Sequence, residues 1–191
     1  VGKSALATQI INNICAKGKH VGYYNLEMTS GQVYDRFISY ISGIDMGHLR
    51  NATCFLNDDK RKFEMANDRF AKYKLAIVSR KPMASDISVS ARHMGYDVIV
   101  IDYLQLMIAE KSYSGNRSAE VGSISKALKD LAMNLNIPII LLSQLNRASE
   151  ARDTKEPTMA DLRESGDIEQ DASIIMLMWN TSEDRMHKCL K

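Results

Sequence analysis

One run of five residues, Val98-Ile99-Val100-Ile101-Asp102, does most to limit how this chain can fold. Its first four residues are apolar and β-branched, which suits a strand that is buried on both faces. Such strands occur in parallel sheets whose two faces are covered by helices. The run therefore predicts an α/β fold. Asp102 is expected at the carboxyl end of the strand, where open α/β sheets bind ligands.

A second feature, at the start of the chain, predicts what that ligand is. Val1-Gly2-Lys3-Ser4 is the last half of a phosphate-binding P-loop, and an amphipathic helix with Leu6, Ile10, Ile11 and Ile14 follows it directly. Backbone N–H groups of such a loop point at phosphates, the lysine reaches the outer phosphates and the hydroxyl reaches magnesium. Gly2, Lys3 and Ser4 are therefore predicted to bind a nucleoside triphosphate and Mg²⁺. The usual first glycine of the motif, five residues before Gly2, lies upstream of the sequence.

The two motifs together predict an ATPase or GTPase. Asp102 is then the Walker B acid, which holds magnesium directly or through water. The alternative is that Asp102 only caps the next segment.

The remaining segments alternate between strand and helix patterns. Strand–helix–strand order implies right-handed crossovers and a mostly parallel central sheet with helices on both faces. We therefore expect an α/β P-loop three-layer sandwich, with the last two strands close enough in sequence to form a hairpin. Strands are predicted at 20–26, 75–79, within 97–107, and at 137–143, 174–179 and 186–190, and helices at 31–41, 58–74, 85–94 and 118–135. The charged helix at 58–74 mixes both signs and is interpreted as a solvated face, with a binding patch as the alternative.

Composition sets limits on this interpretation. The 191 residues are 45% hydrophobic and contain no Pro-rich or Gly-rich linker, so a single domain over residues 1–191 is expected. The formal charge of +2 is too close to neutral to indicate nucleic acid by itself. Three widely spaced cysteines predict free thiols in a reducing cytoplasm, and no apolar run reaches the ~18 residues of a membrane span.

Two further polar residues follow predicted strands. Glu27 comes after the strand at 20–26. Its carboxylate would lie beside the P-loop if that strand neighbours the first strand, the one that leads into the P-loop. From there it could orient the water that attacks the γ-phosphate; the alternative is a helix-capping acid. Gln144 follows the strand at 137–143 and could sense the γ-phosphate, or be a buried or capping amide.

Several segments resemble DnaB-type replicative helicases, in the order seen in that family. They are Gly2-Lys3-Ser4, Asn25-Leu26-Glu27-Met28, Ile101 through Met107, Leu142 through Arg147, and Asp161-Leu162-Arg163-Glu164-Ser165-Gly166-Asp167-Ile168-Glu169-Gln170-Asp171-Ala172. The last is the most specific, because generic P-loop proteins do not carry it. The resemblance covers essentially the whole chain and implies the RecA-like C-terminal motor domain of a replicative DNA helicase.

The resemblance also implies roles and partners. Glu27 would activate water, and Gln144 would couple the nucleotide to DNA. Single-stranded DNA would run through the channel of a homohexamer, contacted by Arg163, Glu164 and Gly166. Glu164 would act through its backbone, since its carboxylate is repelled by phosphate. A salt bridge within the acidic turn is the alternative for Arg163. The polar loop 111–117 is either a second channel loop or a solvent loop.

The resemblance carries further expectations about the whole protein. ATP is expected as the nucleotide, and primase and a helicase loader would bind through parts outside these residues. In the family, a basic residue of the neighbouring subunit, the arginine finger, completes each active site. The sequence stops at Lys191, before the segment that would carry this residue. Because such fingers contribute roughly 10³ to 10⁵ in rate, we expect these residues alone to be nearly inactive. Two other functions fit the same motifs: a RecA- or RadA-like recombination ATPase, and a non-hydrolysing DNA-assembly subunit that holds ATP structurally.

Overall fold

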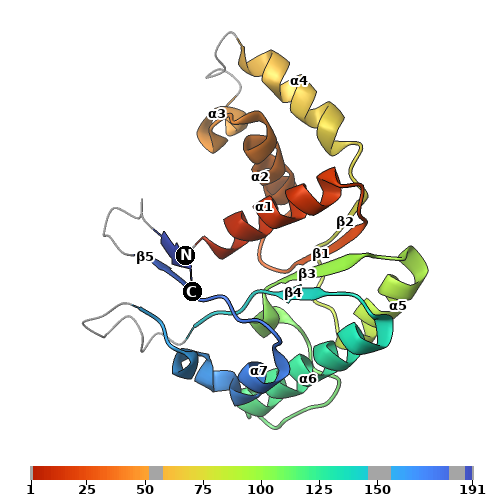
Figure 1. Ribbon diagram of the computed structural model, residues 1–191, viewed down its shortest axis with the longest axis vertical. Coiled ribbons are helices and arrows are strands. Elements are labelled where there is room, and N and C mark those ends of the chain that lie inside the picture. Colours follow the sequence, from red (N-terminus) through yellow and green to blue (C-terminus); the bar gives the residue numbers. More distant parts are fainter. Residues whose placement is uncertain (1, 52–57, 146–155, 181–187, 191) are drawn as a thin grey trace.

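The computed structural model describes residues 2–51, 58–145, 156–180 and 188–190, except the side chains of 163–167, 180 and 188–190. Helices and strands alternate along most of the chain (Figure 1). In chain order the elements are α1 (Lys3–Ala16), β1 (Val21–Asn25), α2 (Ser30–Ser42), α3 (Met46–Arg50), α4 (Asp59–Phe70), β2 (Leu75–Val78), α5 (Ala84–Met94), β3 (Val98–Asp102), η2 (Leu104–Leu106), α6 (Arg117–Leu135), β4 (Ile139–Leu141), η4 (Met159–Ser165), α7 (Gly166–Asp171), β5 (Met178–Asn180) and β6 (Lys188–Leu190).

Four strands form a parallel sheet in the order β2-β1-β3-β4. The register pairs Asn25 at the end of β1 with Asp102 at the end of β3, so both strands finish at the same level. β1 has β2 on one side and β3 on the other. The sequence analysis placed Glu27 beside the P-loop on the condition that its strand neighbours an upstream first strand. That condition is wrong, because both edges of β1 are already occupied.

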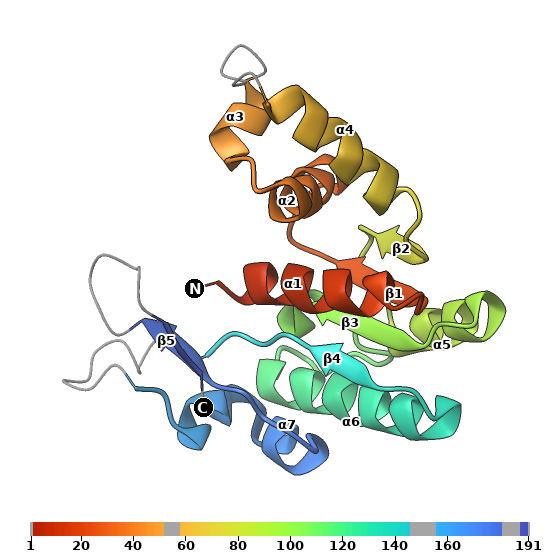
Figure 2. The same cartoon turned by 45° about the horizontal axis from the view of Figure 1, so that its top comes forward.

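The sheet is covered on both faces, as the run at 98–102 predicts (Figures 1 and 2). On one face the helices α1 and α2 pack against Val21, Tyr23 and Val100. On the other face α5 and α6 pack against the intervening residues, which include Tyr24, Ile99 and Ile101. All five residues of β1 and of β3 are buried. This arrangement confirms the predicted three-layer sandwich, because each face of a parallel sheet needs its own apolar cover.

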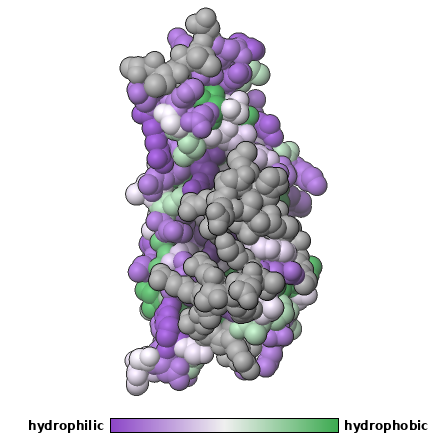
Figure 3. Space-filling model, turned by 90° about the vertical axis from the view of Figure 1, so that its left-hand side faces the viewer, coloured by the Kyte–Doolittle hydropathy of each residue, from purple (hydrophilic) through white to green (hydrophobic). Residues whose placement is uncertain are grey.

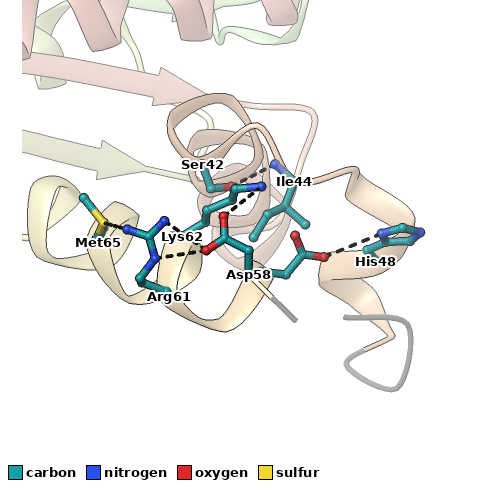
Figure 4. A network of polar contacts seen from close by, with 8 residues as sticks. Ser42, Ile44, His48, Asp58, Arg61, Lys62 and Met65 are labelled. Atoms are coloured by element: carbon teal, nitrogen blue, oxygen red, sulfur yellow. Dashed lines mark hydrogen bonds and ion pairs between the residues drawn. The ribbon is translucent and has the colours of Figure 1, made fainter. Parts of the chain in front are cut away.

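A helical lobe formed by α2, α3 and α4 extends from the α1 side of the sheet (Figure 1). Its helices are joined by polar contacts. Arg50 Nε lies 3.8 Å from Asp35 Oδ2, and His48 Nδ1 lies 3.9 Å from Asp59 Oδ2. At the start of α4, Asp58 accepts from Arg61 at 2.9 Å and contacts Lys62 at 3.4 Å (Figure 4). The lobe is mainly hydrophilic on the face shown in Figure 3. The interpretation of α4 as a solvated face, with a binding patch as the alternative, stays a prediction.

Some predicted boundaries are wrong. The charged helix ends at Phe70 rather than near residue 74, because the chain turns at Ala71 and brings the Tyr73 hydroxyl within 2.6 Å of Asn12 on α1. Of the predicted strand 174–179, only residues 178 and 179 belong to a strand, β5, which continues to Asn180. The predicted hairpin is confirmed, since β5 and β6 pair antiparallel, but they form a separate two-stranded sheet. Within the described residues no helix is long and apolar enough to cross a membrane.

Candidate nucleotide-binding site

The candidate site lies at the carboxyl end of the parallel sheet, where α1 begins. Gly2 precedes α1 with φ of 90°, a left-handed conformation that glycine adopts without steric cost. Lys3 is the first residue of the helix, and the Ser4 carbonyl accepts from the Thr8 hydroxyl at 2.8 Å. The first N–H groups of a helix have no partner within the helix, so this end can bind an anion.

Lys3 lies in a field set by two carboxylates. Burial lowers the pKa of Lys3, while the negative charges of Asp102 and Glu27 act in the opposite direction. The Lys3 ammonium also lies 5.5 Å from the centre of the Tyr103 ring. The structure therefore brings together three residues that the sequence analysis singled out, Lys3, Glu27 and Asp102, although they come from separate segments.

Asp102 is completely buried at the end of β3. Its Oδ2 accepts a hydrogen bond from the Tyr23 hydroxyl at 3.3 Å, whereas Oδ1 has no hydrogen-bond partner among the described residues. Burial, followed by the charge of Asp102 and this hydrogen bond, raises the pKa of Tyr23 well above its ordinary value. Within the described residues neither oxygen of Asp102 makes a cap contact, and the residue before η2 is Tyr103. The capping alternative is therefore wrong.

Glu27 lies in the turn between β1 and α2 and is exposed. The cap of α2 is made by other residues: the Thr29 side chain accepts from the backbone N–H of Gln32, and the Gln32 side chain accepts from that of Thr29. The capping alternative for Glu27 is wrong as well. Asn25 fixes the start of this turn, because its Nδ2 donates to the carbonyl of Met28. Asn25 is itself completely buried.

Gln144 follows β4 and is exposed, so the alternative of a buried amide is wrong. Its backbone N–H donates to Gln105 Oε1 at 3.3 Å, and Gln105 Nε2 donates to the Ser143 hydroxyl at 2.9 Å. Arg117, at the start of α6, donates to the backbone carbonyl of Gln105. Gln105 thus joins the segment after Asp102 to the segment that carries Gln144.

The predicted DNA-contacting residues lie in another part of the molecule. Arg163 and Glu164 are in η4, and Gly166 is the first residue of α7. Near the start of η4, Asp161 Oδ2 accepts from the Thr158 backbone N–H at 2.7 Å. The roles of Arg163, Glu164 and Gly166 stay predictions. Asn146 and Arg147 of the neighbouring motif lie outside the described residues.

The sequence analysis missed Tyr23, Asn25 and Gln105. Residues 23 and 25 share a face of β1, and the register places Asp102 next to Asn25 on that face, so the roles of the first two follow from the strand register. Gln105 lies inside a segment quoted for its family resemblance, but no role followed from its position. No pattern within a segment indicates a contact to a residue 38 positions later in the chain.

The donor set fits magnesium bound with a nucleotide. The described residues contain no group of three or more His, Cys, Asp or Glu side chains that could hold a metal alone. Mg²⁺ in nucleotide sites takes one or two protein oxygens and completes its shell with phosphates and water. The unpartnered, buried Oδ1 of Asp102 and the hydroxyl of Ser4 are oxygens of that kind.

Known proteins with related sequences are replicative helicases. A probable plasmid replicative DNA helicase from Chlamydia muridarum is 39% identical over 184 residues, and a replicative DNA helicase DnaB from Geobacillus stearothermophilus is 37% identical over 185. The alignments cover 93% and 94% of this chain, which spans only 40% of the length of either relative. A solved structure of a DnaB-like replicative helicase and its interactions with primase superposes with a TM-score of 0.89 and 31% identity. The superposition covers 94% of this chain and 45% of the chain in that structure.

The family described as the DnaB-like helicase C-terminal domain matches residues 1–189, nearly the whole sequence. Together with the parallel sheet and the gathering of Lys3, Glu27 and Asp102, this match establishes the relationship. The chain belongs to the family of DnaB-like helicase C-terminal domains.

Proposed function

We propose that this chain is the motor domain of a hexameric replicative helicase, which hydrolyses ATP with Mg²⁺ to move along single-stranded DNA and unwind duplex. The observation that carries the proposal is the position of Lys3 at the start of α1, within the electrostatic influence of both Asp102 and Glu27. Phosphoryl transfer needs a cation for the phosphates, a metal-holding acid and a water-orienting group in one place. The family assignment favours a helicase over a recombination ATPase.

Each residue has a role that its environment supports. Lys3 binds the outer phosphates, together with backbone N–H groups at Gly2 and the start of α1. Ser4 and Asp102 hold Mg²⁺, which supplies charge neutralisation for the phosphates when it is bound. Glu27 is exposed in the turn after β1 and its charge acts on Lys3, so its carboxylate can orient the attacking water.

Coupling to DNA runs through the segment after β4. Gln144 is held by Gln105, which itself lies in the segment following Asp102, so a change at the nucleotide can be passed on through hydrogen bonds. Arg163 and the Gly166 amide contact DNA phosphates, and Glu164 contributes its backbone N–H. We expect primase and a helicase loader as partners of the full-length protein, which would act in the cytoplasm.

The test is MgATP hydrolysis by the full-length protein, with and without single-stranded DNA. It compares wild type, Glu27→Gln and a matched control, Glu64→Gln, which removes an exposed carboxylate from α4. Loss of one transition-state group typically lowers the rate by 10²- to 10⁴-fold, and we expect a loss of about that size in Glu27→Gln only.

Three outcomes would contradict parts of the proposal. Equal rates in wild type and Glu27→Gln would remove Glu27 as the catalytic carboxylate. Hydrolysis that ignores DNA would remove the helicase function. Binding of ATP without any turnover by the wild type would favour the structural-ATP alternative instead.

A further inference from the structure

The two oxygens of the Asp102 carboxylate have different environments. Oδ2 is engaged by the Tyr23 hydroxyl at 3.3 Å, and Oδ1 is buried with no partner among the described residues. A buried carboxylate oxygen without a hydrogen bond is unfavourable unless a ligand completes it. The asymmetry leaves one oxygen anchored to the protein and the other available.

Tyr23 is held firmly enough to act as that anchor. Its side chain is 1% exposed and packs in the apolar layer between the sheet and α1. The Phe37 ring on α2 meets it edge-on, with centroids 6.5 Å apart. Because a tyrosine side chain has only two rotatable χ angles, a packed ring fixes the position of its hydroxyl.

The sheet register explains how Tyr23 reaches Asp102. Tyr23 pairs with Val100 and Asn25 pairs with Asp102, so Tyr23 is the diagonal neighbour of Asp102 on the α1 side of the sheet. A long side chain can reach a diagonal neighbour across two strands, whereas an aliphatic residue there would offer no donor. This contact therefore depends on the tyrosine at position 23.

We propose that Tyr23 is a positioning residue for the metal site: its hydroxyl holds Asp102 Oδ2 and so keeps Oδ1 available to the nucleotide-bound metal ion or its water. The inference rests on the proposed function, because it concerns the metal that accompanies the nucleotide. Tyr23 touches Asp102 rather than the metal. Without the hydroxyl, the carboxylate can rotate about its χ2 bond and loses its fixed orientation.

The variant that isolates this role is Tyr23→Phe, which keeps the ring and removes only the hydroxyl. Tyr24→Phe is the matched control, because Tyr24 is the next residue on β1 and is buried on the opposite face, in the layer that contains Tyr96. Both variants remove one hydroxyl from a buried ring of the same strand. Of these two hydroxyls, that of Tyr23 is the one that hydrogen-bonds to Asp102.

The measurement is the affinity for Mn²⁺, a paramagnetic probe of the magnesium site, in full-length protein saturated with a non-hydrolysable ATP analogue. Electron paramagnetic resonance reports free Mn²⁺ directly. Removing an outer-shell partner of a metal ligand typically weakens metal binding by 10- to 100-fold, and we expect a loss of about that size for Tyr23→Phe. Tyr24→Phe should bind Mn²⁺ as wild type does.

Wild-type Mn²⁺ affinity in Tyr23→Phe would overturn the inference, and so would an equal loss in both variants. A double-mutant cycle with Asp102→Asn gives a second test. In the Asp102→Asn background, Tyr23→Phe should cause no further loss of Mn²⁺ affinity. A further loss there would show that Tyr23 acts by another route. Binding is measured without hydrolysis, so an inactive wild type would refute the proposed function while this comparison still tests Tyr23.

Discussion

Replacing Gly22 on β1 even by alanine should lower the stability of the protein. A Cβ built at this position would lie 2.7 Å from two ring carbons of Tyr96, closer than real Cβ contacts occur. The ring cannot move away easily: it is 5% exposed, stands edge-on to His20 with centroids 4.9 Å apart, and its hydroxyl lies 3.2 Å from that of Ser90.

The size of the effect follows from two opposing contributions. Overpacking a core by a methyl group costs about 1–3 kcal/mol. Replacing glycine also restricts the unfolded chain, which offsets about 0.4–1 kcal/mol of that cost. The midpoints of these two ranges differ by about 1.3 kcal/mol, so we expect Gly22→Ala to lower the free energy of unfolding by roughly that amount, because the steric contribution is the larger.

The assay is equilibrium urea unfolding of wild type, Gly22→Ala and Gly31→Ala. Gly31 lies in the first turn of α2, and a Cβ there meets no atom within 4 Å. This control should be neutral or stabilising by up to about 1 kcal/mol, the difference in helix propensity. In a Tyr96→Leu background, Gly22→Ala should lose its penalty. Unchanged stability in Gly22→Ala, or the same penalty without the Tyr96 ring, would refute the reasoning.

Two further predictions concern titratable groups. The His20 backbone N–H and the Lys19 ammonium hold the pKa of Asp97 below its ordinary value, at 2.7 and 3.0 Å. A carboxyl whose pKa is depressed by folding stabilises the protein above its unfolded pKa of about 3.9, and this contribution is lost as pH falls through the folded pKa. Asp97→Asn should therefore show a shallower loss of stability with acid below that pH in urea unfolding; an unchanged slope would contradict this. Burial raises the pKa of Cys15 to about 12. In a Cys54→Ser/Cys189→Ser background, Cys15 should react with an aromatic disulfide reagent at pH 8 only when urea unfolds the protein, and rapid reaction of the native protein would contradict its burial.

The strands and long helices could be predicted because their own residues set them. The apolar run at 98–102 predicted that helices cover both faces of the sheet. The residues that cap α2, Thr29 and Gln32, lie directly at the start of that helix. The end of α4 could not be predicted, because its sequence stays charged and helix-compatible past Phe70. What ends the helix is the contact of Tyr73 with α1, about sixty residues away in sequence. The helix α7 was not predicted because its six residues are too few to show a helical pattern.

For the candidate site, the motifs predicted the residues that carry charge but not their supports. Lys3, Glu27 and Asp102 are recognisable because each has a fixed place relative to a strand or helix. Tyr23 acts through a partner on another strand and Gln105 through residues that follow another strand, so their roles depend on strand order and register. The order β2-β1-β3-β4 was needed to see that Tyr23 faces Asp102.

The alternation of faces along β1 has a consequence for how this protein can change over evolutionary time. Residues 21, 23 and 25 face the side of the sheet that holds Asp102, while Tyr24 belongs to the larger apolar layer beneath α5 and α6. On the proposal above, substitutions at Tyr23 would alter the orientation of Asp102 while the opposite layer continues to support the fold. Adjacent positions in a single strand thus face different constraints: on the proposal above, Tyr23 serves both the packing of its layer and the orientation of Asp102, whereas Tyr24 serves packing alone.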